Sequence, residues 1–340
     1  MRATSRELVL QTLNFQDPAR APRDLWTLPI AAKAYPQEHA AILGDFPSDM
    51  RGIAGHERQR PPTQGNPHQV GEYVDEWGCT FTNIQNGVIG EVKQPLVRDW
   101  DTDRQKIHIP QEWLTIERDA INRDCARTDK FTLAGCSPRP FEQLQFIRTT
   151  EELYVDLMER PATFLAFMKR MHHFYTSLLD VWAKTDVDGI FFMDDWGSQR
   201  ALLISPALWR EYFKPMYRDY VQIAHAAGKK IFMHSDGCIL DIYPDLVEIG
   251  IDAVNSQIFC MGVEKLKPFA GRITFWGEMD RQHLLPQGTP ADIDRAVRTV
   301  HRALWAHGGC FAQCEFGAAA KPENVRQVFA SWDEVSHRPL

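Results

Sequence analysis

The sequence predicts an α/β fold built on a parallel sheet. From residue 131 onward, short apolar segments typical of strands alternate with longer amphipathic segments typical of helices, which is the rhythm of successive βα units. No Ser/Gly/Pro-rich linker interrupts this rhythm, so we expect one domain over residues 1–340. The expected strands are residues 25–28, 131–136, 189–193, 230–234, 253–256, 273–277 and 309–314, and the main expected helices are 150–183, 206–227, 239–249, 290–307 and 322–331.

Residues 1–130 predict an N-terminal elaboration of this domain. Ser5 can cap a first helix whose apolar face includes Leu8 and Leu13. The stretch 45–75 is rich in Pro, Gly, Gln and His, and we expect an irregular insertion there. Short alternating runs within residues 76–100 are typical of a small hairpin.

Parallel strands can form an open doubly wound sheet or a closed eight-stranded barrel. An open nucleotide-binding sheet normally carries a Gly-rich turn after its first strand, and the sequence has neither GxGxxG nor GxxxxGK[ST]. In a barrel, functional residues lie at the carboxyl ends of several strands. Polar or metal-binding groups do end six successive expected strands, so the barrel is favoured; these groups lie at residues 137–139, 194–196, 234–237, 255–257, 278–280 and 314–315.

Composition excludes several classes of protein. The formal charge is −7, from 38 Lys and Arg against 45 Asp and Glu, which argues against a nucleic-acid-binding protein. No stretch approaches the roughly 18 consecutive apolar residues of a membrane span, and the charged first residues argue against a signal peptide. The seven cysteines form no CxxC pair, which is typical of a reducing compartment, so we expect a cytoplasmic protein.

Three residues at predicted strand ends are candidates for a metal site. His234 and Asp236 are two positions apart on one strand, so their side chains point the same way, and Cys314 ends a later strand. Zinc accepts all three residue types, and catalytic zinc sites use three protein ligands and one open position. Glu278 could be a fourth ligand or a catalytic base. The alternative is that His234 hydrogen-bonds a backbone carbonyl and Cys314 is simply packed.

Asp194 and Asp195 are candidates for acid–base chemistry. They follow the apolar strand 189–193, where two adjacent carboxylates would repel each other and one could have a raised pKa. We expect Asp194 to act as a general acid or base, or as an electrostatic clamp for a cationic substrate. The alternative for Asp195 is that it caps a turn or pairs with Arg200 or Arg210.

Aromatic and polar groups beside the same strand ends are candidates for contact with a small-molecule substrate. The chain has 10 Trp and 19 Phe residues, and some of these rings could line a pocket for a flat ligand. Packing in the core is the alternative for each of them. The expected substrate-binding residues are Trp26, Asp195, Trp196, Asn255, Gln257, Trp276 and Glu315.

The sequence resembles the uroporphyrinogen decarboxylase-like superfamily, in particular its branch of corrinoid-linked, zinc-dependent methyltransferases. The resemblance runs over most of the chain and is carried by residues 16–22, 75–78, 194–197, 204–206, 213–215, 234–237, 248–255, 276–280, 314–315 and 321–325. It implies a distorted (β/α)8 TIM barrel. It also implies a zinc-dependent methyltransferase or demethylase that acts with a corrinoid, either methylcobalamin or a corrinoid protein, and with a small-molecule methyl donor or acceptor.

One position departs from the methyltransferase pattern. That branch holds zinc with a His-x-Cys pair and a late Cys, and it activates a thiol such as coenzyme M. By this resemblance His234 and Cys314 match the first and last ligands, whereas Asp236 stands at the middle Cys. A carboxylate is a harder ligand than a thiolate. The departure therefore points to another acceptor, such as tetrahydrofolate, or to demethylation of a methoxylated or methylamine-type substrate.

Two other functions stay open at this point. A metal-free lyase related to the decarboxylases is one, although their Arg-rich N-terminal motif has no counterpart in residues 26–33 beyond Lys33. A non-catalytic tetrapyrrole-binding barrel is the other. The sequence has no Asp-x-His-x-x-Gly corrinoid-ligand motif, so we expect any corrinoid to come from a partner protein or from solution. A homodimer is compatible with these features.

Overall fold

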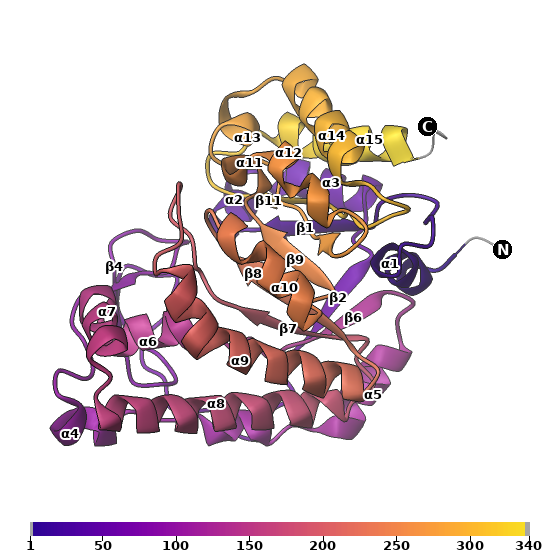
Figure 1. Cartoon of the computed structure of the whole chain (residues 1–340). Coiled ribbons are helices and arrows are strands. Elements are labelled where there is room, and N and C mark those ends of the chain that lie inside the picture. Colours follow the sequence, from indigo (N-terminus) through magenta and orange to yellow (C-terminus); the bar gives the residue numbers. More distant parts are fainter. Residues whose placement is uncertain (1–2, 337–340) are drawn as a thin grey trace.

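The structure, a computed structural model, describes residues 3–336. It is an α/β fold in which parallel strands lie side by side at the centre and helices cover them (Figure 1). Within residues 3–336, eight strands pair in parallel. They are β1 (Arg23–Thr27), β2 (Met50–Ile53), β6 (Phe131–Ala134), β7 (Gly189–Met193), β8 (Lys230–Ser235), β9 (Ala253–Ser256), β10 (Thr274–Phe275) and β11 (Ala312–Phe316).

The strands form two groups that two further contacts connect. Six strands follow the order β10-β9-β8-β7-β6-β2, and β1 pairs with β11. The backbone N–H of Asp49, just before β2, donates to the carbonyl of Arg23 in β1 at 2.8 Å. A parallel bridge joins Phe275 of β10 to Cys310, just before β11. The eight strands therefore follow one another around a common interior, as in a TIM-barrel-like fold.

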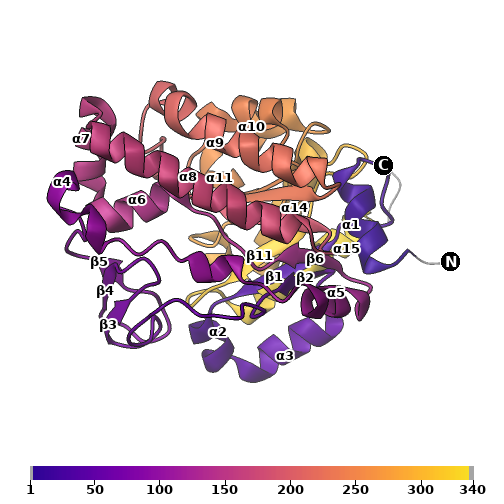
Figure 2. The same cartoon turned by 90° about the horizontal axis from the view of Figure 1, so that it is seen from below.

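The helices lie outside the strands, as βα units require. Figures 1 and 2 show α8 and α9 running side by side along one flank, and α14 and α15 packing together on another. The longer helices are α1 (Ser5–Leu13), α3 (Pro36–Asp45), α5 (Arg118–Ala126), α6 (Pro140–Arg148), α7 (Thr150–Glu159), α8 (Ala162–Ala183), α9 (Pro206–Ala226), α10 (Tyr243–Ile249), α14 (Pro290–Leu304) and α15 (Pro322–Ser336).

Shorter elements connect these parts of the chain. The short α-helices are α2 (Pro29–Ala34), α4 (Trp100–Asp103), α11 (Ile258–Met261), α12 (Val263–Leu266) and α13 (Leu284–Gln287). Single 3₁₀ turns are η1 (Arg104–Lys106), η2 (Gln111–Leu114), η3 (Leu240–Ile242) and η4 (Lys267–Phe269). The expected helix 150–183 is divided in two, because Arg160 adopts a left-handed conformation and Pro161 follows it.

The N-terminal elaboration contains a small antiparallel sheet. Strands β3 (Gly71–Val74), β4 (Thr80–Asn83) and β5 (Glu91–Val92) pair in that order and lie at one end of the molecule, near α4 and α6 (Figure 2). The expected hairpin is confirmed by the β4–β5 pair. The expectation of an irregular insertion over residues 45–75 is wrong in part, because this stretch supplies both β2 and β3. Strand β2 was hidden because only two of its four residues are apolar.

Alternation along the strands separates an inner face from an outer face. On β8, Phe232 belongs to a small apolar cluster, whereas Ile231 and Met233 belong to the large core. The small cluster draws on α1 and on strands around the whole ring, so it fills the interior, and the large core fills the space between strands and helices. The inner cluster is Val9, Leu13, Met50, Phe131, Phe232, Ala253, Trp276 and Phe311.

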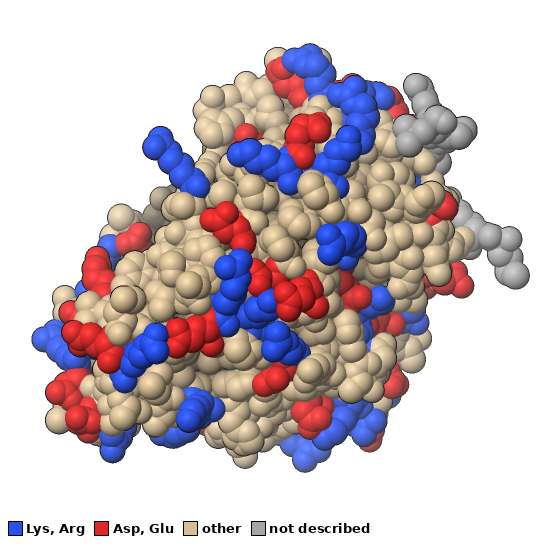
Figure 3. Space-filling model, viewed as in Figure 1, with Lys and Arg blue, Asp and Glu red and all other residues tan. Residues whose placement is uncertain are grey.

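Two surface properties complete the description. On the face drawn in Figure 3, Lys and Arg side chains are intermixed with Asp and Glu side chains. Among the helices of residues 3–336, none has the length and apolar character needed to cross a membrane.

Candidate metal centre and active site

A cavity of about 530 Å³ opens where the carboxyl ends of the strands meet. This is the end of a parallel barrel at which enzymes carry their active sites. Its walls come from strands that are far apart in the sequence, namely β1, β2, β6, β7, β8 and β11. Among its lining residues are Trp26, Phe191, His234, Asp236, Trp276 and Glu315.

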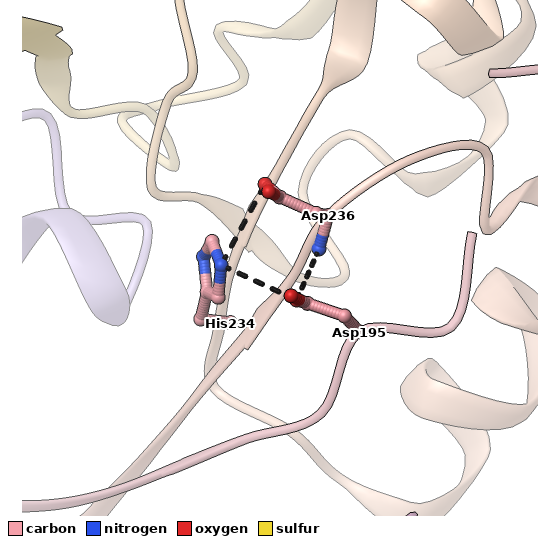
Figure 4. Close-up of side chains that lie close together, drawn as sticks. All are labelled: Asp195, His234 and Asp236. Carbon is pink, nitrogen blue, oxygen red and sulfur yellow. Dashed lines mark hydrogen bonds and ion pairs between the residues drawn. The ribbon is translucent and has the colours of Figure 1, made fainter. Parts of the chain in front are cut away.

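Three side chains at the ends of β7 and β8 converge beside this cavity (Figure 4). His234 Nε2 lies 3.6 Å from Asp195 Oδ1 and 3.6 Å from Asp236 Oδ1. The three ligand atoms all lie within 4.8 Å of one another. In the part of the chain that the structure describes, no other group of three or more His, Cys, Asp or Glu residues has this geometry. We refer to Asp195, His234 and Asp236 as the ligand group.

Asn255 fixes the orientation of the histidine in the ligand group. The Asn255 Nδ2 group donates to the backbone carbonyl of Trp276 at 2.5 Å, so the amide oxygen faces His234. That oxygen lies 2.7 Å from His234 Nδ1. Because an amide oxygen can only accept, Nδ1 carries a proton and donates it to Asn255, and Nε2 is the ring nitrogen that faces the two aspartates. A hydrogen bond of this kind commonly orients a metal-binding histidine.

The ligand group fits a zinc ion in both chemistry and spacing. Zinc takes imidazole nitrogen and carboxylate oxygen, and catalytic sites keep one position open for substrate. In a tetrahedral site with metal–ligand distances of about 2.1 Å, neighbouring ligand atoms are about 3.4 Å apart. The 3.6 Å separations around His234 Nε2 are close to this value.

A network of charged groups holds Asp236 in place. Arg281 forms a hydrogen-bonded ion pair with Asp236 Oδ2. The second oxygen, Oδ1, faces His234 and accepts from Gln257 Nε2 at 3.2 Å. Arg281 also lies 3.1 Å from Glu315 Oε2, so one guanidinium is shared between strand-end carboxylates. This arrangement leaves Oδ1 of Asp236 available to a metal.

Glu278 is a buried carboxyl group near the ligand group. Its side chain is only 2% exposed, and neither oxygen has a hydrogen-bond partner. Arg281 Nη1 is 3.5 Å from Oε1, which is ion-pair but not strong hydrogen-bond distance. Burial raises the pKa of Glu278 to about 8, although the Arg281 charge opposes the shift. Glu278 can therefore hold a proton at neutral pH, as a general acid must.

Asp24 is a half-buried acid of the cavity that sequence reasoning missed. The indole N–H groups of Trp26 and Trp276 both donate to its Oδ2, at 3.0 and 2.9 Å. Trp26 in turn packs 5.2 Å from the His234 ring. Burial raises the pKa of Asp24, while the two indole donors oppose that shift. Its position two residues before Trp26 is the signal that could have found it, because both side chains face the same way on a strand.

Arg281 was also missed, although it directly follows the strand-end segment 278–280. A cation beside several acids at one rim is the signal that identifies it. Five expected substrate-binding residues do lie at the cavity or against the ligand group: Trp26, Asp195, Asn255, Trp276 and Glu315. Gln257 contacts Asp236 and lines a smaller adjoining cavity of about 230 Å³.

The structure does not bring Cys314 to the ligand group. Cys314 is fully buried and belongs to the large core with Ala312 and Phe316, whereas Phe311 and Glu315 face the interior. Because side chains alternate along β11, Cys314 points to the outer face. In the structure, Asp195 takes the place that the sequence assigned to Cys314.

Asp194 likewise lies on the outer face, away from the cavity. Its Oδ2 accepts from the backbone N–H of Phe141 at 3.0 Å and from Tyr217 Oη at 2.6 Å, and its Oδ1 accepts from the N–H of Glu142 at 2.9 Å. Phe141 and Glu142 lie in the first turn of α6, where a carboxylate satisfies free N–H groups. These contacts are structural, and they contradict the expectation that Asp194 acts on the substrate.

Trp196 belongs to the outer face as well. It is 0% exposed, stacks on Phe141 at 4.0 Å between ring centroids and donates from Nε1 to Tyr217 Oη at 2.8 Å. The expected contact between Trp196 and a substrate is therefore wrong, because the ring is part of the core around α9.

The fold and the site together define a barrel-like α/β protein with a metal-competent group at its strand ends. A family model described as uroporphyrinogen decarboxylase (URO-D) matches residues 74–335, which is more than half of the chain. The chain therefore belongs to the uroporphyrinogen decarboxylase (URO-D) family, as its motifs predicted.

A solved structure adds to this assignment. A methyltransferase from Methanosarcina mazei matches with a TM-score of 0.67 and 15% sequence identity, covering 98% of this chain and 99% of that chain. At 15% identity the likeness establishes the fold and not the activity. A comparison with curated protein sequences gave no match.

Proposed function

We propose that this protein is a zinc-dependent methyltransferase or demethylase, acting with a corrinoid and a small-molecule methyl donor or acceptor. The observation that carries the proposal is the convergence of His234 Nε2 with Asp195 and Asp236 at the mouth of the strands. The whole-chain likeness to a methyltransferase supports the same reaction class. We interpret the circular strand order as a distorted (β/α)8 barrel.

Separate residues of this chain would bind the metal, orient the imidazole and hold a proton. Asp195, His234 and Asp236 would hold zinc, with Asn255 orienting the imidazole. Zinc bound there would act as a Lewis acid toward an oxygen, nitrogen or sulfur atom of the substrate. Glu278 would hold a proton for a group that leaves or enters the site, because burial keeps it protonated at neutral pH.

The ligand group also bears on the acceptor. It contains one imidazole, two carboxylates and no thiolate. Zinc bound by oxygen and nitrogen is a stronger Lewis acid than zinc bound by thiolates, and it keeps a bound thiolate less nucleophilic. We therefore propose that the natural acceptor or donor group is an oxygen or nitrogen compound, and that methyl transfer from methylcobalamin to coenzyme M is poor.

Zinc content and methyl transfer test this proposal together. Wild-type protein should contain about one zinc per chain and should change the visible spectrum of methylcobalamin when its acceptor is present. His234→Ala should lose both properties, whereas the control His68→Ala, an exposed histidine of the N-terminal elaboration, should keep both. Zinc-free wild type with full methyl transfer would overturn the proposal.

Further measurements distinguish the alternatives. A metal-free lyase would release carbon dioxide from a carboxylated substrate, with a rate that chelators leave unchanged. A tetrapyrrole-binding protein without activity would bind the corrinoid and leave its methyl group in place. Either result would replace the proposed function.

A further inference from the structure

Two buried polar side chains near the ligand group have no partner among the described residues. Glu278, which follows β10, is 2% exposed, and Gln313 of β11 is 1% exposed. Within residues 3–336, neither oxygen of Glu278 and neither polar atom of the Gln313 amide has a hydrogen-bond partner. Such atoms are costly to bury, and native proteins satisfy most of them with protein groups or with internal water. These four atoms therefore indicate a site for a small hydrogen-bonding molecule.

Both side chains line one small cavity beside β10 and β11. Its volume is about 10 Å³, which is close to the space that one water molecule needs. The other lining residues are mainly apolar or aromatic, such as Ile258, Phe259 and Val300, and among the described residues no further carboxyl or amide side chain belongs to the lining. We refer to this cavity as the internal site.

Gly277 determines where the Gln313 amide lies. Its φ of +82° is in the left-handed region, and a Cβ at this position would overlap Gln313 Oε1. The amide therefore packs directly against the backbone that precedes Glu278. Gln313 also shares the inward side of β11 with Phe311 and Glu315, because side chains alternate along a strand.

One water molecule can satisfy three of the four unpartnered atoms. A primary amide and a water molecule form a cyclic pair, in which the water oxygen accepts from Nε2 and one water hydrogen is donated to Oε1. The second hydrogen of the water is then free for one oxygen of Glu278. Three hydrogen bonds are typical of an internal water molecule. The other oxygen of Glu278 is left for a different partner.

Glu278 also lines the adjoining cavity of about 230 Å³. Gln257 lines this cavity and donates to Asp236 of the ligand group at 3.2 Å. Arg281 lines both the adjoining cavity and the central one. The carboxyl group of Glu278 therefore lies between the internal site and a space that reaches the ligand group.

We propose that a water molecule in the internal site, bound by Gln313, donates to one oxygen of Glu278, so that the proton of Glu278 lies on the other oxygen and faces the adjoining cavity. Gln313 is then a positioning residue, because it acts on a substrate only through Glu278. The use of this proton rests on the proposed function, but the binding of the water does not depend on it. The internal site would make one of two equivalent carboxyl oxygens the proton donor.

The groups around Glu278 give this proposal a consequence for its pKa. Its titratable and charged neighbours are Asp280 and Arg281 of the same segment, Asp236 after β8, and Cys314 and Glu315 of β11. Burial raises the pKa of Glu278 most, Arg281 lowers it, and the three neighbouring acids raise it further. A water that donates to the carboxyl group stabilises its charged form and lowers the pKa. Loss of this water should therefore raise the pKa of Glu278.

A crystal structure at high resolution tests the internal site directly. We expect density for one water molecule within about 3.2 Å of the Gln313 amide and of one Glu278 oxygen. Gln313→Met replaces the amide by an unbranched apolar side chain, and this density should be lost in that variant. Absence of the water from the wild type, or a direct hydrogen bond between Gln313 and Glu278 in its place, would overturn the inference.

The positioning role is tested by the pKa of Glu278. It can be followed by NMR of protein labelled with ¹³C at its glutamate carboxyl groups, with Glu278→Gln identifying the signal. Gln313→Met should raise this pKa by about one unit and move the upper limb of the pH profile of activity by the same amount. The control Gln287→Met removes an exposed amide of α13, outside both cavities, and should change neither. An unchanged pKa in Gln313→Met would refute the positioning role.

These measurements separate the inference from the proposed function. An ordered water and the expected pKa shift in a protein that transfers no methyl group would refute the proposed function and leave the internal site standing. Methyl transfer by a protein whose internal site binds no water would refute the internal site alone.

Discussion

The two faces of the central strands have opposite characters, although their residues are neighbours in the sequence. On the outer face, Asp194 satisfies two backbone N–H groups and a tyrosine and is fully buried. On the inner face, the next residue, Asp195, faces His234 across 3.6 Å and is partly exposed. The fold therefore satisfies the Asp194 carboxylate, whereas Asp195 keeps capacity for a metal or a substrate.

Among the substitutions proposed for these strands, Asp194→Asn should lower the free energy of unfolding the most. Asp194→Asn keeps the shape but turns one acceptor oxygen into a donor against the backbone of α6. We expect a loss of about 3 kcal/mol in the free energy of unfolding, measured by urea denaturation. Zinc content and turnover per folded molecule should stay near wild type. Normal stability with abolished turnover would show that Asp194 acts on the substrate after all.

Changing Asn255 should have the opposite signature, because this residue serves the inner face. Asn255→Leu removes the acceptor that fixes the His234 tautomer, and zinc affinity should fall about 10- to 100-fold in a competition with a chromophoric chelator. Asn255→Asp is the matched control, since it keeps an acceptor for Nδ1 and should retain more of the affinity. Equal zinc affinities of the two variants would show that the hydrogen bond does not orient the ligand.

The raised pKa of Glu278 predicts that the stability of the protein depends on pH. Its pKa is about 8 in the folded protein against 4.5 for the ordinary side chain, so the folded state binds the extra proton between these values. The contribution of Glu278 to stability therefore falls as pH rises from about 4.5 to 8. Glu278→Gln should remove this dependence and gain about 3 kcal/mol over wild type at pH 8 relative to pH 5. Activity should be lost, and wild-type activity should decline above pH 8.

Thermal unfolding of both proteins across this pH range measures the effect. Parallel pH profiles of wild type and Glu278→Gln would mean that Glu278 ionises normally. In that case the unpartnered carboxyl could not serve as the proton donor proposed for the site.

Much of the fold could be predicted from the sequence because the inner strands are strongly apolar. The expected strand 189–193 coincides with β7, and 253–256 coincides with β9. Strand β2 was missed because its four residues include Arg51 and Gly52, and its strand character comes from pairing with β6. Local sequence does not contain that long-range contact.

The sequence places the candidate site at the carboxyl ends of the strands, where the structure has the cavity and the ligand group, but it does not distinguish the two faces of each strand. Every residue of the strand 189–193 is glycine or apolar, so composition did not show whether Asp194 or Asp195 faces inward. Cys314 and Glu315 present the same choice at the end of β11. Since side chains alternate along a strand, one member of each adjacent pair had to lie outside the cavity. The contacts with α6 and with the large core decide which one.

Zinc analysis of Asp195→Ala and Cys314→Ala, by mass spectrometry of protein purified with added zinc, tests the central claim most directly. Asp195 follows β7 and Cys314 lies in β11, but Asp195 faces His234 whereas Cys314 belongs to the outer face. We predict that Asp195→Ala loses its zinc and that Cys314→Ala holds about one zinc per chain, like wild type. Loss of zinc from Cys314→Ala with full retention by Asp195→Ala would contradict the ligand group described for this protein.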